Sequence, residues 1–119
     1  MSAVTVYTLK NCSTCREAVK WLRAQKIEFV EKPIRETPPT VTELRAVLAA
    51  QDGQVRKLFN TSGLEYRALK IAEQLPTLSE DDALALLARN GSLVKRPLLV
   101  RGAVGLVGFD PTEWARALG

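Results

Sequence analysis

The chain has 119 residues, 46% of them hydrophobic and 25% charged, which excludes a wholly disordered, fibrous or low-complexity protein and allows one compact domain. No apolar run approaches the roughly 20 residues of a membrane helix, so we expect no membrane contact. The formal net charge of +4 comes without any run of lysine or arginine, which favours small anions or protein partners and predicts no direct nucleic-acid binding.

The N-terminal third predicts a strand, a helix and a second strand. Residues 1–7 lack a basic start followed by an apolar core, so we expect no signal peptide and a cytoplasmic protein. Residues 4–9 are rich in β-branched and aromatic side chains and predict a strand. A turn follows at residues 10–11, and a helix begins near Cys12. Residues 27–31 alternate and predict the second strand, which completes a βαβ unit.

Cys12 and Cys15 form a C-x-x-C motif between the first strand and the helix. A structural zinc site needs four ligands, and the chain has neither histidine nor a second cysteine pair, so we expect no metal. In this position the spacing indicates redox chemistry. The helix N-terminus favours the thiolate at Cys12, and Cys15, one turn later, can resolve a mixed disulfide. The alternative is that both are small buried apolar residues.

The residues around Cys12 are candidates for anion binding. Asn11, Ser13 and Thr14 can offer backbone N–H groups to an anion, or their side chains simply cap the helix. Arg16, like Lys10, adds positive charge beside the sulfur.

The middle of the chain predicts mostly helix. After a connector over residues 33–39, Thr40 and Glu43 form a capping-box pattern that opens a helix ending at Asp52. The sequence then predicts, in order, a short helical piece over 55–59, a loop over 60–63, one helix over 64–75 and a capped helix over 79–90.

The last third returns to strands. Pro97 leads into a strand over residues 98–100, and a turn at Gly102 precedes its partner over 104–107. Asp110 as an N-cap, followed by a first-turn proline, opens the final helix. The order β-α-β, helical block, β-β, α is that of a thioredoxin-like sheet with a helical insert.

Four segments resemble the family of ArsC arsenate reductases and Spx-related proteins, and the similarity covers nearly the whole chain. They are residues 7–18 (YTLKNCSTCREA), 60–69 (NTSGLEYRAL), 95–100 (KRPLLV) and 108–109 (GF). The resemblance implies an α/β, thioredoxin-like (glutaredoxin-like) fold with a mixed four-stranded sheet. It also implies a single domain over 1–119, with the thioredoxin-like part at about 1–36 and 93–119 and the insert at about 37–92.

The resemblance also implies a chemistry. In arsenate reductases of this type the first cysteine attacks arsenate, three arginines hold the oxyanion, and glutathione with glutaredoxin discharges the adduct. Cys12 takes the place of the nucleophile here, and Arg67 and Arg96 match two of the arginines. Residues 109–110 (FD) stand where the third arginine is expected. Because a carboxylate repels an oxyanion, this departure argues against efficient arsenate turnover.

Both arginines have a second interpretation. Arg96 offers a planar fork to a tetrahedral anion, or is a solvated charge at a strand end, with Pro97 merely starting an edge strand. The resemblance implies that the Arg96–Pro97 peptide is cis and lies against the active-site cysteine. Arg67 holds the anion, or points to solvent or pairs with Glu65 or Glu73.

Two hypotheses follow. The first is a thiol-dependent oxidoreductase without a bound cofactor, with Cys12 as nucleophile and Cys15 as resolving thiol. Its substrate is a small oxyanion or a thiol adduct, and its electron donor is glutathione with glutaredoxin, or thioredoxin. The alternative rests on Cys15, a feature of the Spx branch, and is a redox-sensing regulator that binds the RNA polymerase α subunit. For either we expect a monomer.

Overall fold

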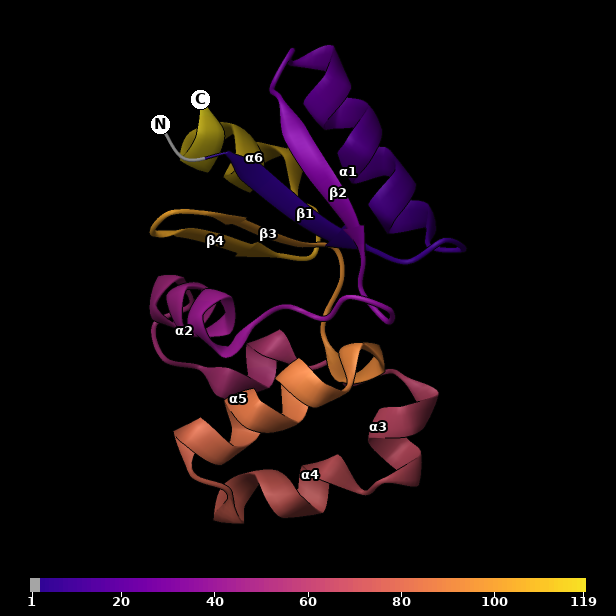
Figure 1. Cartoon of the computed structure of the whole chain (residues 1–119), viewed down its shortest axis with the longest axis vertical. Coiled ribbons are helices and arrows are strands. Elements are labelled where there is room, and N and C mark those ends of the chain that lie inside the picture. The colour runs from indigo at the N-terminus through magenta and orange to yellow at the C-terminus, as the bar shows by residue number, and fades with distance from the viewer. Residues whose placement is uncertain (1–2) are drawn as a thin grey trace.

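A computed structural model describes residues 3–119, which fold into a sheet with helices on both faces (Figure 1). Met1 and Ser2 lie outside the described residues. The predicted start of the domain at residue 1 and the prediction of no signal peptide include these two residues. The strands are β1 (Val4–Thr8), β2 (Phe29–Pro33), β3 (Leu98–Arg101) and β4 (Val104–Val107). The helices are α1 (Ser13–Ala24), α2 (Val41–Ala50), α3 (Leu64–Ala68), α4 (Ile71–Gln74), α5 (Glu80–Arg89) and α6 (Pro111–Leu118), with 3₁₀ turns η1 (Val55–Leu58), η2 (Leu75–Thr77) and η3 (Gly91–Leu93).

The sheet has the order β2-β1-β3-β4. Strand β1 runs parallel to β2, with Val4 opposite Phe29, and antiparallel to β3, with Val6 opposite Leu99. Strands β3 and β4 pair as an antiparallel hairpin. This mixed four-stranded sheet, with one β-α-β crossover and a terminal hairpin, confirms the predicted α/β class and thioredoxin-like fold.

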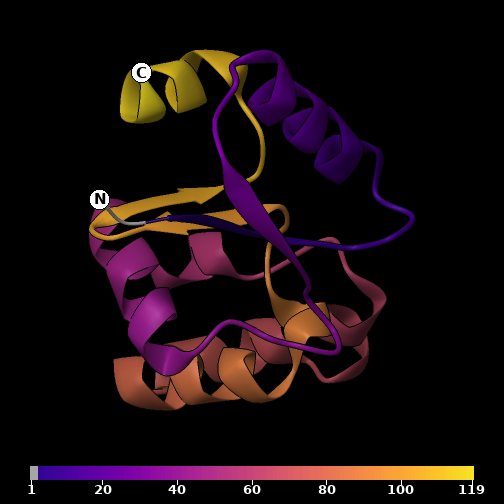
Figure 2. The same ribbon diagram turned by 45° about the horizontal axis from the view of Figure 1, so that its top comes forward.

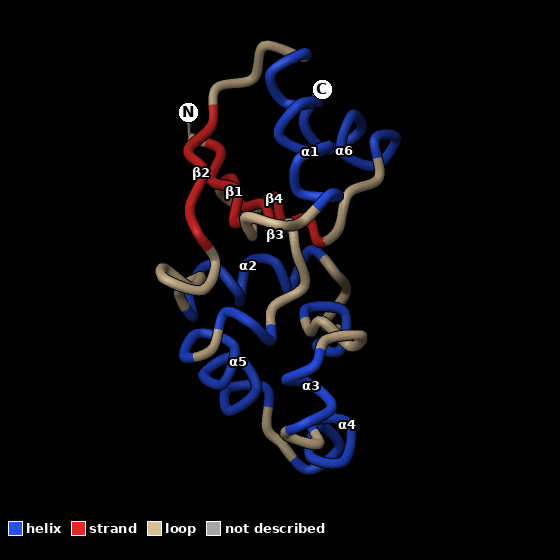
Figure 3. The backbone as a smooth tube through the Cα atoms, turned by 90° about the vertical axis from the view of Figure 1, so that its right-hand side faces the viewer, coloured by secondary structure: helices blue, strands red, loops and turns tan. Residues whose placement is uncertain are grey.

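Each face of the sheet carries its own hydrophobic core. Helices α1 and α6 cover one face, and the helices between β2 and β3 lie on the other (Figures 2 and 3). Because side chains alternate along a strand, Val4 and Val6 pack with Leu22 and Trp114 on the first face, whereas Tyr7 joins the core of the second. The sheet therefore joins the two cores, and its carboxyl-terminal edge at β1 leads directly into the C-x-x-C motif.

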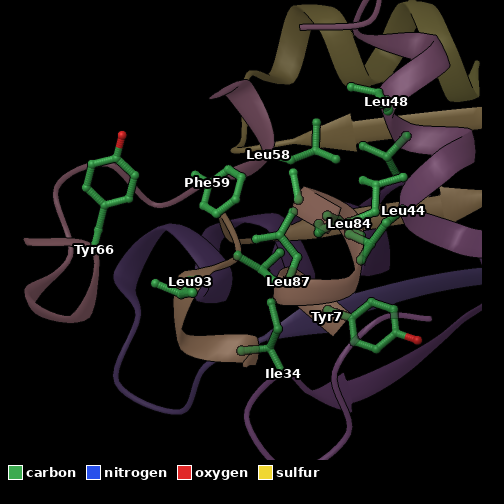
Figure 4. Close-up of a cluster of buried hydrophobic side chains, with 14 of the residues drawn as sticks. Tyr7, Ile34, Leu44, Leu48, Leu58, Phe59, Tyr66, Leu84, Leu87 and Leu93 are labelled. Atoms are coloured by element: carbon green, nitrogen blue, oxygen red, sulfur yellow. The ribbon is translucent and has the colours of Figure 1, made fainter. Parts of the chain in front are cut away.

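The helical insert is attached to the sheet by close packing and by polar contacts of α2 and its C-cap with β1 and β4. A Cβ atom at Gly105 in β4 would lie 2.5 Å from the Val47 Cα, so glycine allows α2 to approach the strand. The Tyr7 hydroxyl of β1 donates to the Glu43 Oε1 of α2 at 2.6 Å. Glu43 also completes the predicted capping box with Thr40. Figure 4 shows the surrounding cluster of buried side chains, with Leu44 and Tyr7 among them.

Two predicted elements differ in the structure. The second strand begins at Phe29 rather than Ile27, because Lys26 adopts φ 58° and the Ile27 N–H donates to the Leu22 carbonyl, closing α1. The strand extends to Pro33, and an edge strand tolerates proline there.

The single helix predicted over 64–75 is wrong, since Lys70 adopts φ 54° and separates α3 from α4. Tyr66 and Ile71 are both buried in the insert core. Five residues apart on one helix they would point about 140° away from each other, so the break lets both reach the same core. None of the helices within residues 3–119 has the length and apolar character to cross a membrane.

Candidate active site

Cys12 is the N-cap residue of α1. Its backbone is extended, and its Sγ accepts the Cys15 backbone N–H at 3.1 Å, the position that a serine or aspartate oxygen usually takes. The side-chain caps considered for Asn11, Ser13 and Thr14 are therefore wrong, because the sulfur caps this helix. This sulfur therefore lies at the positive end of a 12-residue helix, half-buried and bonded to a backbone amide.

Cys15 lies one turn into α1 and is 2% exposed. Burial raises the pKa of its thiol to about 12, the hydrogen bond with Cys12 acts in the same direction, and the nearby Arg96 charge opposes both. Cys15 therefore keeps its proton at neutral pH. Both cysteines are free thiols in the structure. The geometry thus separates an accessible sulfur at Cys12 from a buried, protonated one at Cys15.

A groove of about 560 Å³ lies beside Cys15. Its lining includes Val19, four cations and one carboxylate, Glu31; the cations are Lys10, Arg16, Lys20 and Arg23. Asn11, Ser13, Thr14 and Arg16 are all exposed. The predicted site residues on the loop and the first turn of α1 thus lie at the surface, and Arg16 is one of the cations that line the groove beside Cys15.

Arg96 approaches the site from the segment before β3. Its Nη1 is buried and has no hydrogen-bond partner. The Arg96–Pro97 peptide is cis, as expected. Strand β3 lies between β1 and β4, so the alternative of Pro97 starting an edge strand is wrong. Burying a guanidinium nitrogen without a hydrogen-bond partner costs free energy. Such an unpaired group is typical of a site that binds an anionic ligand.

Arg96 lines a second cleft of about 640 Å³ on the insert side. The other lining residues are polar or charged for the most part: Arg35, Asn60, Ser62, Gly63, Leu64, Glu65 and Ser92. The loop over residues 60–63 thus contributes to the cleft. Arg35 was not predicted, because it lies in the connector after β2, where nothing in the sequence distinguishes it from a solvated charge.

The structure does not bring Arg67 into this cleft. Arg67 is exposed on α3, and its Nη2 donates to the Ser62 carbonyl at 3.2 Å. No ion pair joins it to Glu65 or Glu73 among the described residues. Of its alternative interpretations, the one in which it points toward solvent agrees best with this position.

Residues 109–110, where the resemblance led us to expect an arginine, have structural roles. Asp110 is the N-cap of α6 and accepts the backbone N–H groups of Thr112 and Glu113. Phe109 packs on Trp114 with ring centroids 4.9 Å apart. Neither residue lines the Arg96 cleft, so the carboxylate of Asp110 does not face an anion bound there.

Comparison with known proteins identifies one family, whose members include proteins named as regulators and proteins named as arsenate reductases. The model of the ArsC family matches residues 7–117. The uncharacterized protein YusI of Bacillus subtilis (strain 168) is 44% identical over 94% of this chain and 95% of its own. The global transcriptional regulator Spx of Enterococcus faecalis is 30% identical over 97% of this chain and 86% of its own.

The structural comparison gives the same family resemblance. The crystal structure of a possible arsenate reductase from Streptococcus mutans UA159 superposes with a TM-score of 0.84. It is 37% identical in sequence and covers 92% of both chains. Relatives with a reductase name and relatives with a regulator name thus share this fold.

Proposed function

This chain belongs to the ArsC family, and on that premise we propose that it is a thiol-dependent oxidoreductase with Cys12 as nucleophile and Cys15 as resolving thiol. The observation that carries the proposal is the 3.1 Å hydrogen bond from the Cys15 backbone N–H to the Cys12 Sγ at the N-cap of α1. It places the half-buried Cys12 sulfur at the helix N-terminus, while the second sulfur stays buried and protonated one turn away.

The proposed reaction begins on a mixed disulfide between glutathione and a substrate thiol. The Cys12 thiolate attacks the glutathione sulfur, the disulfide breaks, and the substrate leaves as a thiolate that takes a proton. Cys12 is now bonded to glutathione and no longer presents a negative charge to Cys15. The Cys15 thiol releases its proton and attacks the Cys12 sulfur, which expels glutathione. Two electrons have passed from the cysteine pair to the substrate.

An external dithiol such as glutaredoxin or thioredoxin, or two glutathione molecules, returns these electrons and regenerates the free thiols. Arsenate is the alternative oxidant that the name of the Streptococcus mutans relative suggests. In that case the same two thiols reduce As(V) to As(III), and arsenite and water leave. Arg96 supports either substrate, because its unpartnered Nη1 suits an arsenate oxygen as well as a glutathione carboxylate.

The test is NADPH consumption in a glutathione–glutaredoxin-coupled assay, with a glutathione mixed disulfide or arsenate as substrate. We expect turnover by the wild type and its loss in Cys12→Ser. The Cys15→Ser variant distinguishes internal resolution, which it would abolish, from resolution by external glutathione, which it would leave intact. Absence of turnover with both substrates, in a protein that still forms the Cys12–Cys15 disulfide, would refute the enzyme.

A second function is favoured by a separate observation, the 30% identity to Spx over nearly the whole chain. It is a regulator without turnover, whose Cys12–Cys15 disulfide controls binding to the RNA polymerase α subunit. The measurement is the affinity for the carboxyl-terminal domain of that subunit, with the cysteines reduced and oxidised. A redox-dependent affinity in a protein without turnover would support the regulator, and no binding in either state would exclude it.

A further inference from the structure

The Arg96 cleft carries a pattern of charges that a simple oxyanion site does not need. Two arginines, Arg35 and Arg96, line it together with one carboxylate, Glu65. Hydroxyl and amide side chains from Ser62 and Asn60 are also among the lining residues. A site built only for a small anion gains nothing from a carboxylate, since it repels the ligand. The pattern fits a ligand with two negative groups and one positive group.

Arg35 is held in place by the close approach of two backbone segments. Its turn follows β2, and the neighbouring Ile34 is fully buried, with its N–H donating to the Thr8 carbonyl at 2.9 Å. On the other side, a Cβ atom at Gly91 would overlap the Ile34 carbonyl and crowd the Arg35 Cα. Glycine at 91 therefore allows η3 to pack directly under the turn. This packing fixes the backbone of Arg35 over a cleft that Ser92 of η3 also lines.

The carboxylate is positioned as well. The Glu65 Oε2 accepts a hydrogen bond from the Asn90 Nδ2 at 2.7 Å. Its second oxygen has no partner among the described residues and is available to a ligand. The cleft thus presents a cation on the turn after β2, a cation before β3 and an oriented carboxylate on α3.

We propose that Arg35, Arg96 and Glu65 bind the peptide part of glutathione, the two arginines holding its two carboxylates and Glu65 its ammonium group. This inference rests on the proposed function, in which glutathione is a reactant. Arg96 lines this cleft, and its charge also lowers the pKa of the Cys15 thiol, against the larger effect of burial. A cleft of about 640 Å³ is large enough for a tripeptide, whereas arsenate would fill a small part of it.

The test is calorimetric titration of the full chain with S-methylglutathione, which has the charges of glutathione but no free thiol. We expect Arg35→Gln to weaken binding about tenfold or more, the usual cost of losing an arginine–carboxylate pair. The matched control is Arg56→Gln, the same change at an exposed arginine of η1, and we expect it to leave the affinity unchanged. Equal affinities of wild type and Arg35→Gln, or no saturable binding to the wild type, would overturn the proposal.

A second pair of titrations tests the ammonium contact. Glu65→Gln keeps a hydrogen-bond acceptor for Asn90 and removes the charge. It should weaken binding of S-methylglutathione and leave binding of its N-acetyl derivative, which lacks the ammonium, unchanged. If Glu65→Gln tightened both, or if inorganic phosphate bound the wild type as tightly as S-methylglutathione, the cleft would be a plain oxyanion site and the proposal would be wrong.

These titrations do not depend on turnover. Binding of S-methylglutathione by a protein without reductase activity would leave the cleft assignment standing and the proposed enzyme refuted. Turnover without binding of S-methylglutathione would support the proposed enzyme and refute the assignment of the cleft.

Discussion

Replacing Tyr7 with phenylalanine tests how the insert is held on the sheet. The Tyr7 hydroxyl is buried against α2 and donates to Glu43 at 2.6 Å. A hydrogen bond to a charged group contributes about 1.5–3 kcal/mol to stability. Glu43 still accepts the Thr40 N–H at 3.0 Å and its hydroxyl at 3.2 Å, so the carboxylate is not left unpaired. The loss therefore lies at the low end, about 1.5 kcal/mol, or roughly 5 °C in Tm.

Urea unfolding at pH 7, followed by circular dichroism with the cysteines reduced, measures this loss. The matched control is Tyr66→Phe, because Tyr66 is also buried but its hydroxyl has no hydrogen-bond partner among the described residues and points away from the cluster (Figure 4). We expect Tyr66→Phe to change the free energy of unfolding by less than about 0.5 kcal/mol. Equal effects of the two substitutions would refute the argument from the Glu43 contact.

The pH dependence gives a second check on the same contact. Burial, with the hydrogen bond and the charge of Glu43, raises the pKa of Tyr7 above its ordinary value of 10.0. Above pH 10 the unfolded chain therefore loses the tyrosine proton while the folded chain retains it, and the stability of the wild type falls. Tyr7→Phe lacks this hydroxyl, so the difference in the free energy of unfolding between the wild type and Tyr7→Phe should become smaller above pH 10. A difference that widens would contradict the assignment.

Three further predictions follow from the site. The reduced wild type should lose stability as pH rises from about 9 toward 12, because burial keeps the Cys15 thiol protonated in the folded chain while the thiol of the unfolded chain ionises. Urea unfolding at pH 8 and pH 10 should show a smaller fall in the free energy of unfolding for Cys15→Ala than for the wild type. An equal fall in both proteins would contradict this role of Cys15. Gly91→Ala should lower the free energy of unfolding by about 1–3 kcal/mol, because the added Cβ overlaps the Ile34 carbonyl. It should also weaken S-methylglutathione binding in calorimetry. A variant as stable as the wild type would show that the turn can move freely. Arg96→Gln should reduce the affinity for S-methylglutathione at least about tenfold. Arg67→Gln should leave it unchanged, because Arg67 does not line the cleft and its Nη2 already donates to the Ser62 carbonyl. Equal losses would contradict this placement.

Local sequence signals were enough for much of the fold. The β-branched run before Cys12, the capping box at Thr40 and the proline after Asp110 each act through the backbone of their own segment, and each element forms where it was predicted. Of the two exceptions, the later start of β2 follows from the local end of α1, and the break within residues 64–75 was decided by distant contacts. The break at Lys70 follows from the need to bury both Tyr66 and Ile71, which no pattern within residues 64–75 reveals.

The sequence by itself determined that Cys12 opens a helix after a strand with Cys15 one turn later, because that arrangement depends on neighbours in the chain. Only the tertiary structure decided which arginines share a cleft. Arg35 and Arg96 are 61 positions apart in the sequence numbering and meet because Gly91 lets one backbone segment pack directly on another. Arg67, which matches an arginine of the family motif, donates to the Ser62 carbonyl of its own loop instead. Side chains that converge through long-range backbone packing leave no periodic or local pattern, and for that reason the sequence alone does not reveal the cleft.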